Sequence, residues 1–172
     1  MKGETVCLTG HRPKSLPWGY HENLQCCLKF KSDLKRVLIG AINYGLTTFL
    51  TGMAEGFDMI ATEILLELRE TYKIKIIAVI PCLDQEIKWK PEQQARYKKI
   101  IEQCDDKIIL AEQYTPTCMN DRNKYMVERS SVCIACWNGK PSGTGNTIRF
   151  AKESGLKIKI INPANEKYDY IS

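Results

Sequence analysis

The sequence has few of the residues and segments that build metal sites and membrane anchors. Only two histidines occur among 172 residues, and no two C-x-x-C pairs have zinc-finger spacing, so we expect neither a metal nor a cofactor. No apolar run approaches the roughly 20 residues of a membrane helix. The opening MKGETVCLTG carries charge where a signal peptide is apolar. These absences favour a cytoplasmic protein without a membrane partner.

The eight cysteines do not predict a disulfide framework. Without a secretory signal, thiols are expected to be reduced and mostly buried. Cys133 and Cys136 have the spacing of a redox pair, but they fall within a predicted strand, where their side chains point to opposite faces. Their Cα atoms would lie ~10 Å apart, which is beyond disulfide reach. We predict that they remain separate thiols.

Length, composition and charge indicate the number of domains and the class of ligand. We expect residues 1–172 to form a single domain, because this length is typical of one. Apolar residues make up 44% and charged residues 26%, as in an ordinary globular protein. The formal net charge of +5 suits anionic small molecules but is too weak to indicate nucleic-acid binding.

Strands and helices are expected to alternate along the chain. Short β-branched and apolar runs that end at glycine or proline predict strands, and apolar residues at three-to-four spacing predict helices. This alternation is typical of an α/β protein, here a Rossmann-like three-layer sandwich with a mostly parallel central sheet. The last strand alternates apolar residues with lysines, which places it near a sheet edge. The predicted strands are Thr5–Thr9, Thr47–Thr51, Ile74–Ile80, Lys107–Ala111, Val132–Trp137 and Leu156–Ile161, and the predicted helices are Glu22–Asn43, Asp58–Tyr72, Pro91–Cys104, Asn120–Arg129 and Asn146–Ser154.

Polar and turn-forming residues gather where the predicted strands end. In parallel sheets of this kind, ligands bind in the crevice beyond the carboxyl ends of the strands. We therefore expect a ligand, most of all an anionic one, at this edge of the sheet. The predicted contact residues in the first loops and after the fifth strand are Thr9, Gly10, His11, Arg12, Gly52, Met53, Ala54, Glu55, Asp58, Pro81, Gln85, Trp89, Asn138 and Gly139.

A glycine-rich stretch before the last helix points to phosphate. Such a turn offers backbone amides and the positive end of the helix dipole. Its two glycines would let an anion approach without a Cβ in the way, and its three hydroxyl side chains could donate. It matches neither the Walker A pattern nor G-x-G-x-x-G, and a structural glycine turn is an equal alternative. The predicted contacts here are Ser142, Gly143, Thr144, Gly145, Asn146 and Thr147.

Several predicted contacts have a structural alternative. Arg12 has the planar fork that suits a phosphate, but an arginine beside a proline is also consistent with simple exposure. His11 would either contact a ligand or cap a turn. Asp58 would either cap the second helix or accept a hydrogen bond from a ribose hydroxyl, a role that Glu55 could also fill. Trp89 would stack on a base or pack in the core.

Five motifs, in order, resemble a known family. They read LTGHRP with LPWGY, TGMAEGFDMIATE, AVIPCLDQEIKW, YTPTCMNDRNKYMVERS and CWNGKPSGTGNTIRFAKESG. The chain resembles the YpsA/YoqJ-like family of bacteria and their prophages, within the SLOG superfamily, from Cys7 to about Pro163. The resemblance implies a Rossmann-like fold and a pocket for nucleotides or their derivatives.

A more distant resemblance concerns the LOG-type phosphoribohydrolases of the same superfamily, which cleave a base from a nucleoside monophosphate. Their motif M-x-E-R-K-x-x-M is similar to residues 119–126, which implies ligand contacts by Arg122, Asn123, Tyr125 and Met126. In their second motif, P-G-G-x-G-T-x-x-E, Arg149 occupies the position of the catalytic glutamate. Because that glutamate stabilises positive charge on the sugar, an arginine opposes the reaction, and we predict no catalytic residue.

Residues and resemblance together favour a protein that senses or sequesters a phosphate-bearing, nucleotide-derived molecule, such as ADP-ribose or an NAD-derived signal. One alternative is a nucleoside-monophosphate N-glycoside hydrolase, in which Glu55 would replace the missing glutamate. Others are a single-strand DNA-binding protein and a cell-division interaction protein. The scattered lysines and the lack of an aromatic stripe argue against DNA. A homo-oligomer is also expected.

Overall fold

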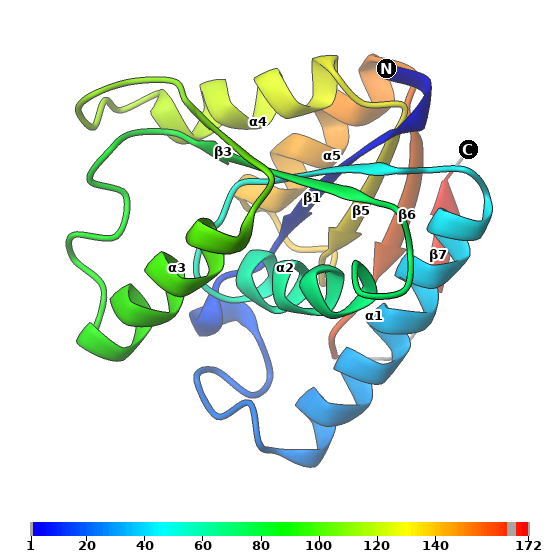
Figure 1. Cartoon of the computed structure of the whole chain (residues 1–172), viewed down its shortest axis with the longest axis horizontal. Helices are drawn as coiled ribbons and strands as arrows, with labels where there is room; N and C mark the ends of the chain where they lie inside the picture. Colours follow the sequence, from blue (N-terminus) through cyan, green and yellow to red (C-terminus); the bar gives the residue numbers. More distant parts are fainter. Residues whose placement is uncertain (1, 165–167, 172) are drawn as a thin grey trace.

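Seven strands form one sheet through the middle of the molecule (Figure 1), in the order β4-β3-β2-β1-β5-β6-β7. The computed structural model describes residues 2–164 and the backbone of residues 168–171. The first six strands are parallel, and β7 runs antiparallel to β6. The strands are β1 (Thr5–Gly10), β2 (Thr48–Thr51), β3 (Lys75–Ile80), β4 (Asp106–Ile109), β5 (Val132–Cys136), β6 (Lys157–Ile161) and β7 (Tyr168–Ile171), and the helices are α1 (Gln25–Asn43), α2 (Phe57–Leu68), α3 (Pro91–Gln103), α4 (Cys118–Glu128) and α5 (Gly143–Glu153).

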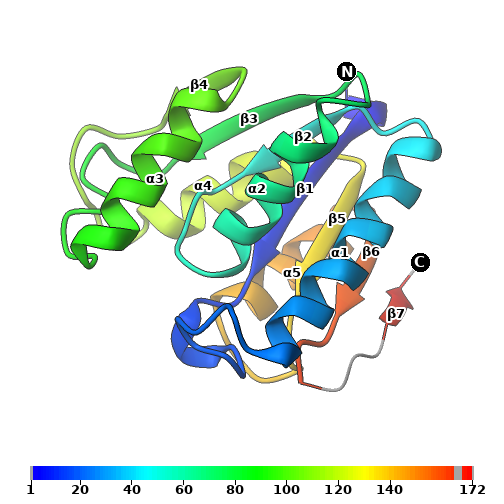
Figure 2. The ribbon, with the colours of Figure 1, turned by 60° about the horizontal axis from the view of Figure 1, so that its bottom comes forward.

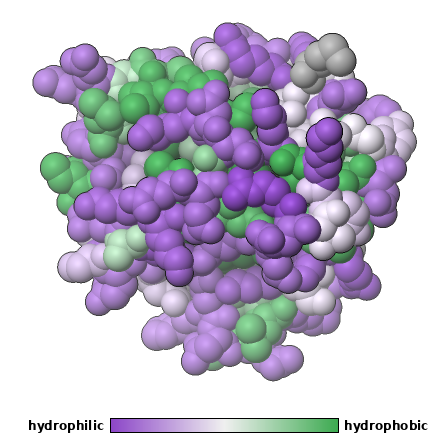
Figure 3. All heavy atoms as spheres, in the orientation of Figure 1, coloured by the Kyte–Doolittle hydropathy of each residue, from purple (hydrophilic) through white to green (hydrophobic). Residues whose placement is uncertain are grey.

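Helices cover both faces of the sheet, which gives three layers. Figures 1 and 2 show α1, α2 and α3 on one face and α4 and α5 on the other. Each face has its own apolar core, and successive residues of a strand alternate between the two. In β1, Val6 and Leu8 join the core under α1 and α2, whereas Cys7 joins the core under α4 and α5. The side of the molecule seen in Figure 3, in the orientation of Figure 1, is mainly hydrophilic, with separate apolar groups.

The predicted fold class is confirmed, and all eleven predicted elements are present with shifted ends. The first helix begins at Gln25 and not at Glu22, because the N-cap Leu24 has an extended backbone and the chain turns before it. The second helix begins one residue earlier than predicted and ends at Leu68, after which the chain turns. The strand β7, which follows the last predicted strand, was not predicted.

The two cysteines with redox-pair spacing lie on opposite faces of β5, as predicted. Cys133 belongs to the core under α4 and α5, and Cys136 belongs to the core under α1 and α2. Both are free and fully buried. Burial raises the pKa of Cys136, so its thiol is held in the protonated, unreactive form. Within the part of the chain that the structure describes, no helix is long and apolar enough to cross a membrane.

Candidate functional site

The order of the strands reverses beside β1. The chain runs outward from β1 through β2, β3 and β4, and then returns to the other side of β1 with β5. Ligands of open α/β sheets bind at the carboxyl ends of the strands next to such a reversal. The loops that carry most of the predicted contacts start at these ends. The candidate site is therefore built on the ends of β1, β2 and β5.

His11 ties the end of β1 to the end of β5. Its backbone amide donates to the carbonyl of Cys136 at 3.2 Å, and its Nε2 accepts from the amide of Asn138 at 3.0 Å. Burial lowers the pKa of His11, which keeps the ring neutral and able to accept this hydrogen bond. This hydrogen bond is the turn-capping contact considered for His11, and its contact with a ligand stays a prediction.

A buried arginine crosses from α4 to the end of β2. Arg122 is 4% exposed, its Nη1 donates to the carbonyl of Gly52 at 2.6 Å, and its Nε donates to Oδ1 of Asn123 at 2.8 Å. A Cβ on residue 52 would lie 2.2 Å from Nη1 of Arg122. Glycine is thus required at this position, because the guanidinium lies directly against the backbone of the second loop.

Asp58 provides the negative charge that faces this arginine. It is 4% exposed, and its Oδ2 accepts from the amide of Ala54 at 3.2 Å. Its Oδ1 is enclosed and has no hydrogen-bond partner among the described residues. Burial raises the pKa of Asp58, and the charges of Arg122 and Arg12 oppose that shift. The helix cap is Gly56 and not Asp58, so the capping alternative is wrong.

Arg12 and Glu55 stand at the mouth of the same site. Arg12 is exposed and donates from Nη2 to the sulfur of Met119 at 3.7 Å. The Glu55 carboxylate accepts from the hydroxyl of Tyr20 at 3.2 and 3.3 Å. Burial raises the pKa of Glu55, and its interactions with Tyr20 and Arg12 oppose this shift. Two arginines and two carboxylates therefore converge where β1 and β2 end.

Tyr20 was not among the predicted contacts. Tyr20 is the last residue of the motif LPWGY. The ammonium of Lys90 lies 4.4 Å from the centre of its ring. Nothing in its local sequence indicates that its hydroxyl reaches residue 55. Only the meeting of the first and second loops in the fold brings the two side chains together.

The glycine-rich stretch forms the first turn of α5, three residues earlier than the predicted start. Ser142 is the N-cap, and its Oγ accepts from the amide of Gly145 at 3.1 Å. The hydroxyl of Thr147 donates to the carbonyl of Gly143 at 3.1 Å. A Cβ on Gly145 would lie 3.2 Å from the ring of Trp137, so packing explains that glycine. No hydrogen bond between described residues uses the amides of Gly143 or Thr144, which leaves them available to an anion.

The remaining predicted contacts divide between the interior and the rim. Gln85 is buried and donates from Nε2 to the carbonyls of Gly52 and Met53, both at 3.3 Å. Trp89 is partly buried and packs edge-on against Tyr97. The side chains of Thr9, Met53, Ala54, Pro81 and Met126 are buried, and Gly139 and Asn146 are exposed. Gly10 has no room for a side chain beside Phe57. The ring of Tyr125 lies under the guanidinium of Arg129.

Arg149 is exposed on the second turn of α5. The buried positions of that helix are Thr144, Thr147, Ile148 and Ala151, so residue 149 lies on the outward face. The enclosed carboxylates of the site come instead from the second loop and from α2. Any acid–base chemistry at this edge would therefore depend on Glu55 or Asp58.

The fold is also that of two solved proteins. DNA processing protein A (DprA) from Streptococcus pneumoniae aligns over 92% of this chain with a TM-score of 0.63 and 20% identity, and this chain spans half the length of that protein. The second is DprA from Helicobacter pylori, in a structure that concerns its single-stranded DNA binding mode. It aligns over 96% of this chain and 71% of that one, with a TM-score of 0.62 and 18% identity.

Sequence comparison identifies relatives over most of the chain. The SPbeta prophage-derived protein YoqJ of Bacillus subtilis is 30% identical over 63% of this chain and 71% of its own length. The UPF0398 protein YpsA of the same organism is 22% identical over 92% of both chains. The model of the YpsA family, described as the YspA SLOG family, matches residues 6–165. The chain therefore belongs to the YpsA family of SLOG proteins.

Proposed function

We propose that the protein binds a phosphate-bearing, nucleotide-derived small molecule, such as ADP-ribose or an NAD-derived signal, at the ends of β1, β2 and β5. The observation that carries the proposal is the enclosed Oδ1 of Asp58, which has no partner among the described residues. A buried acceptor left unpaired costs about 1–3 kcal/mol. A ribose hydroxyl would donate to this oxygen and recover that energy.

Two guanidiniums supply the positive charge that a phosphate needs. Arg122 is fixed by its bond to Gly52, whereas Arg12 is exposed and held only by a weak contact to sulfur. The charges of both arginines act on Asp58, so both lie near this carboxylate. The amides of Gly143 and Thr144, at the positive end of α5, offer a second place for a phosphate. A ligand with at least one phosphate next to a ribose matches this set of groups.

A ligand panel tests the proposal directly. A molecule that binds only the native state at 100 times its dissociation constant adds ~2.7 kcal/mol of stability, a melting shift of roughly 5–10 °C. We expect at least one such response among ADP-ribose, cyclic ADP-ribose isomers, NAD and nucleoside monophosphates. No shift with any of them, together with no heat in titration calorimetry, would refute the proposal.

Arg12 is the cleanest position for a mutational test, because its side chain is exposed. Arg12→Ala should weaken the bound ligand by ~1.5–3 kcal/mol, the range for charge-assisted hydrogen bonds, with little change in the melting temperature of the free protein. Lys14→Ala is the matched control, since it removes an exposed positive charge two residues away. Equal losses in both variants would mean that only net charge matters.

An N-glycoside hydrolase is the second candidate, and Glu55 favours it. Burial raises the pKa of this carboxyl and Tyr20 holds it in place, which are features of a general acid or base. Chromatography should show no multiple-turnover release of base from nucleoside monophosphates if the protein is a binder. Release by the wild type that is abolished in Glu55→Gln would establish the hydrolase instead.

Single-stranded DNA is the third candidate ligand, because DprA from Helicobacter pylori, which has the same fold, binds single-stranded DNA. The likeness at 18% identity concerns the fold, and the formal net charge of +5 is too weak to indicate nucleic-acid binding. We therefore expect no saturable anisotropy change with a labelled oligonucleotide at physiological salt. Binding that saturates, weakens with salt and is lost in Arg12→Ala would favour DNA over the small molecule.

A further inference from the structure

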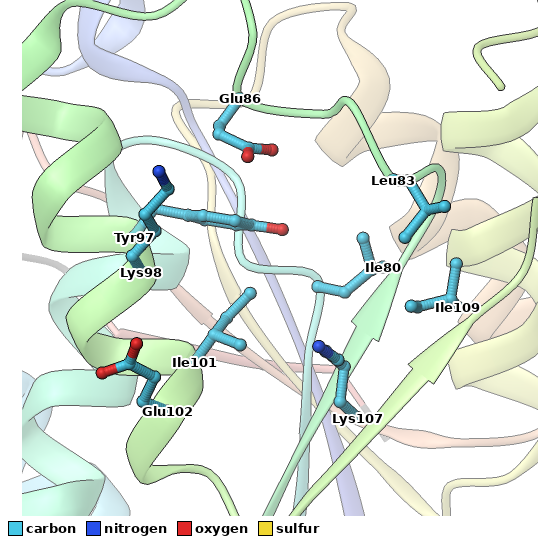
Figure 4. Close-up of a pocket in the computed structure, with 9 residues that line it drawn as sticks. All are labelled: Ile80, Leu83, Glu86, Tyr97, Lys98, Ile101, Glu102, Lys107 and Ile109. Carbon is cyan, nitrogen blue, oxygen red and sulfur yellow. The ribbon is translucent and has the colours of Figure 1, made fainter. Parts of the chain in front are cut away.

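A second pocket lies two strands away from the arginine site, between α3 and the edge strand β4. Its volume is about 250 Å³. Ile80 and Ile109 come from the ends of two neighbouring strands, Ile101 comes from α3, and Leu83 comes from the loop after β3 (Figure 4). Pockets for drug-sized molecules are larger, roughly 300–1,000 Å³. The space therefore suits one flat ring system between apolar walls.

Five polar side chains line this space, and those of Tyr97, Glu86 and Lys107 define the chemistry of its centre; the other two are Lys98 and Glu102. Figure 4 shows the Tyr97 hydroxyl directed to the centre, with the Glu86 carboxylate on one side and the Lys107 ammonium on the other. Tyr97 is 6% exposed, and burial raises its pKa to about 12, so the hydroxyl keeps its proton. The Oε2 of Glu86 is enclosed and has no partner among the described residues. The pocket thus offers a carboxylate acceptor, a hydroxyl and a charged donor.

The arrangement specifies the chemistry of an occupant. An exocyclic amino group would donate to Glu86, and a ring nitrogen or carbonyl would accept from Lys107 or Tyr97. A purely apolar molecule would leave these groups unpaired, and a phosphate would be repelled by Glu86. A planar heterocycle that carries both a donor and an acceptor meets all three conditions. Purine bases belong to that class.

One side chain connects this pocket to the arginine site. Gln85 lies close to Tyr97, which lines the pocket, and donates to the carbonyl of Gly52, which also accepts from Arg122. The ends of β2 and β4 are two strand spacings apart, roughly 10 Å. Tyr97 and Gln85 therefore lie between the pocket and the arginine that we propose to hold phosphate.

We propose that the pocket between α3 and β4 is a subsite for an amino-substituted planar heterocycle, with a purine base as its occupant. The choice of a purine rests on the proposed function, whereas the donor and acceptor pattern does not. Adenine alone is the probe, followed by amide chemical shifts of the labelled protein. We expect millimolar binding, as for a small fragment, with shifts centred on Tyr97, Ile101 and Lys107.

Variants of the pocket make the test specific. Ile101→Trp fills the space and should weaken adenine binding by roughly tenfold or more, while Leu28→Trp, on the exposed face of α1, should change it by less than about twofold. Glu86→Ala and Lys107→Ala should each weaken it by roughly fivefold, the effect of one net hydrogen bond. If Ile101→Trp fails to fold, Ile109→Trp on the edge strand repeats the experiment.

The outcomes separate this subsite from the arginine site. Adenine binding that survives Arg12→Ala but is lost in Ile101→Trp supports the subsite, even if no nucleotide binds more tightly than adenine. Ribose 5-phosphate binding that depends on Arg12, without any adenine response at Tyr97 or Ile101, supports the arginine site and overturns the subsite. Equal adenine affinity in wild type and Ile101→Trp also overturns it.

Discussion

Arg122→Ala removes a side chain that links α4 to the end of β2 and faces a buried carboxylate. The carbonyl of Gly52 would lose its 2.6 Å donor, and Asp58 would lose an opposing charge. An unpaired carbonyl costs about 1–3 kcal/mol, and removing one partner of a buried charge pair costs about 3–5 kcal/mol in all. At this chain length each kcal/mol changes the melting temperature by roughly 2–4 °C. The expected loss is therefore roughly 6–20 °C.

Urea unfolding and thermal melts followed by circular dichroism measure this loss. Arg129→Ala is the control, because it removes an arginine from the end of the same helix that is half exposed and lies over the ring of Tyr125. We expect the control to change stability by about 1 kcal/mol or less. A melting temperature of Arg122→Ala within about 2 °C of wild type would refute the account of the buried contact.

Two further predictions follow from close approaches in the structure. Gly52→Ala should both destabilise the protein and weaken ligand binding, because the added Cβ would lie 2.2 Å from Nη1 of Arg122 and would displace the guanidinium. Thermal melts and calorimetric titration of the same sample measure the two effects, and an unchanged affinity would contradict the prediction. Mild oxidants should leave Cys133 and Cys136 unlinked, since they lie on opposite faces of β5; peptide mapping that found this disulfide in folded protein would contradict the strand register.

Most of the sheet could be predicted from the sequence, because buried parallel strands are short apolar runs and their ends are marked by glycine or proline. Helix starts were less predictable. The stretch from Ser142 to Gly145 is predicted as a turn that precedes a helix starting at Asn146, whereas in the structure Ser142 caps the helix and the glycines form its first turn. The sequence pattern therefore located the turn correctly but not the boundary.

The site shows the same division between local and long-range information. That Arg12, Asp58 and Gly52 follow strand ends is visible in the sequence, because each comes after an apolar run and a turn. That Arg122 reaches the carbonyl of a residue 70 positions earlier depends on how α4 packs over β1 and β2, and no local pattern encodes it. The resemblance to relatives named this arginine, and the fold explains why residue 52 is glycine.

The variant Asp58→Asn tests whether Asp58 holds a ligand or only stabilises the fold. Burial raises the pKa of Asp58, so the folded state binds its proton more tightly than the unfolded state. The ionised carboxylate therefore lowers the free energy of unfolding, and this penalty is relieved as the pH falls through the raised pKa. Asp58→Asn should thus gain stability relative to wild type as the pH rises above about 4, the ordinary pKa of an aspartate. Its ligand affinity should fall by ~1.5–3 kcal/mol, because a ribose hydroxyl would lose a charged acceptor.

Asp33→Asn is the matched control, since Asp33 is a buried carboxylate on α1 that pairs with Lys29 and Arg36. That variant should lose stability and keep its affinity. The same pattern in Asp58→Asn, measured by urea unfolding and titration calorimetry, would show that Asp58 serves the fold and does not hold a ligand.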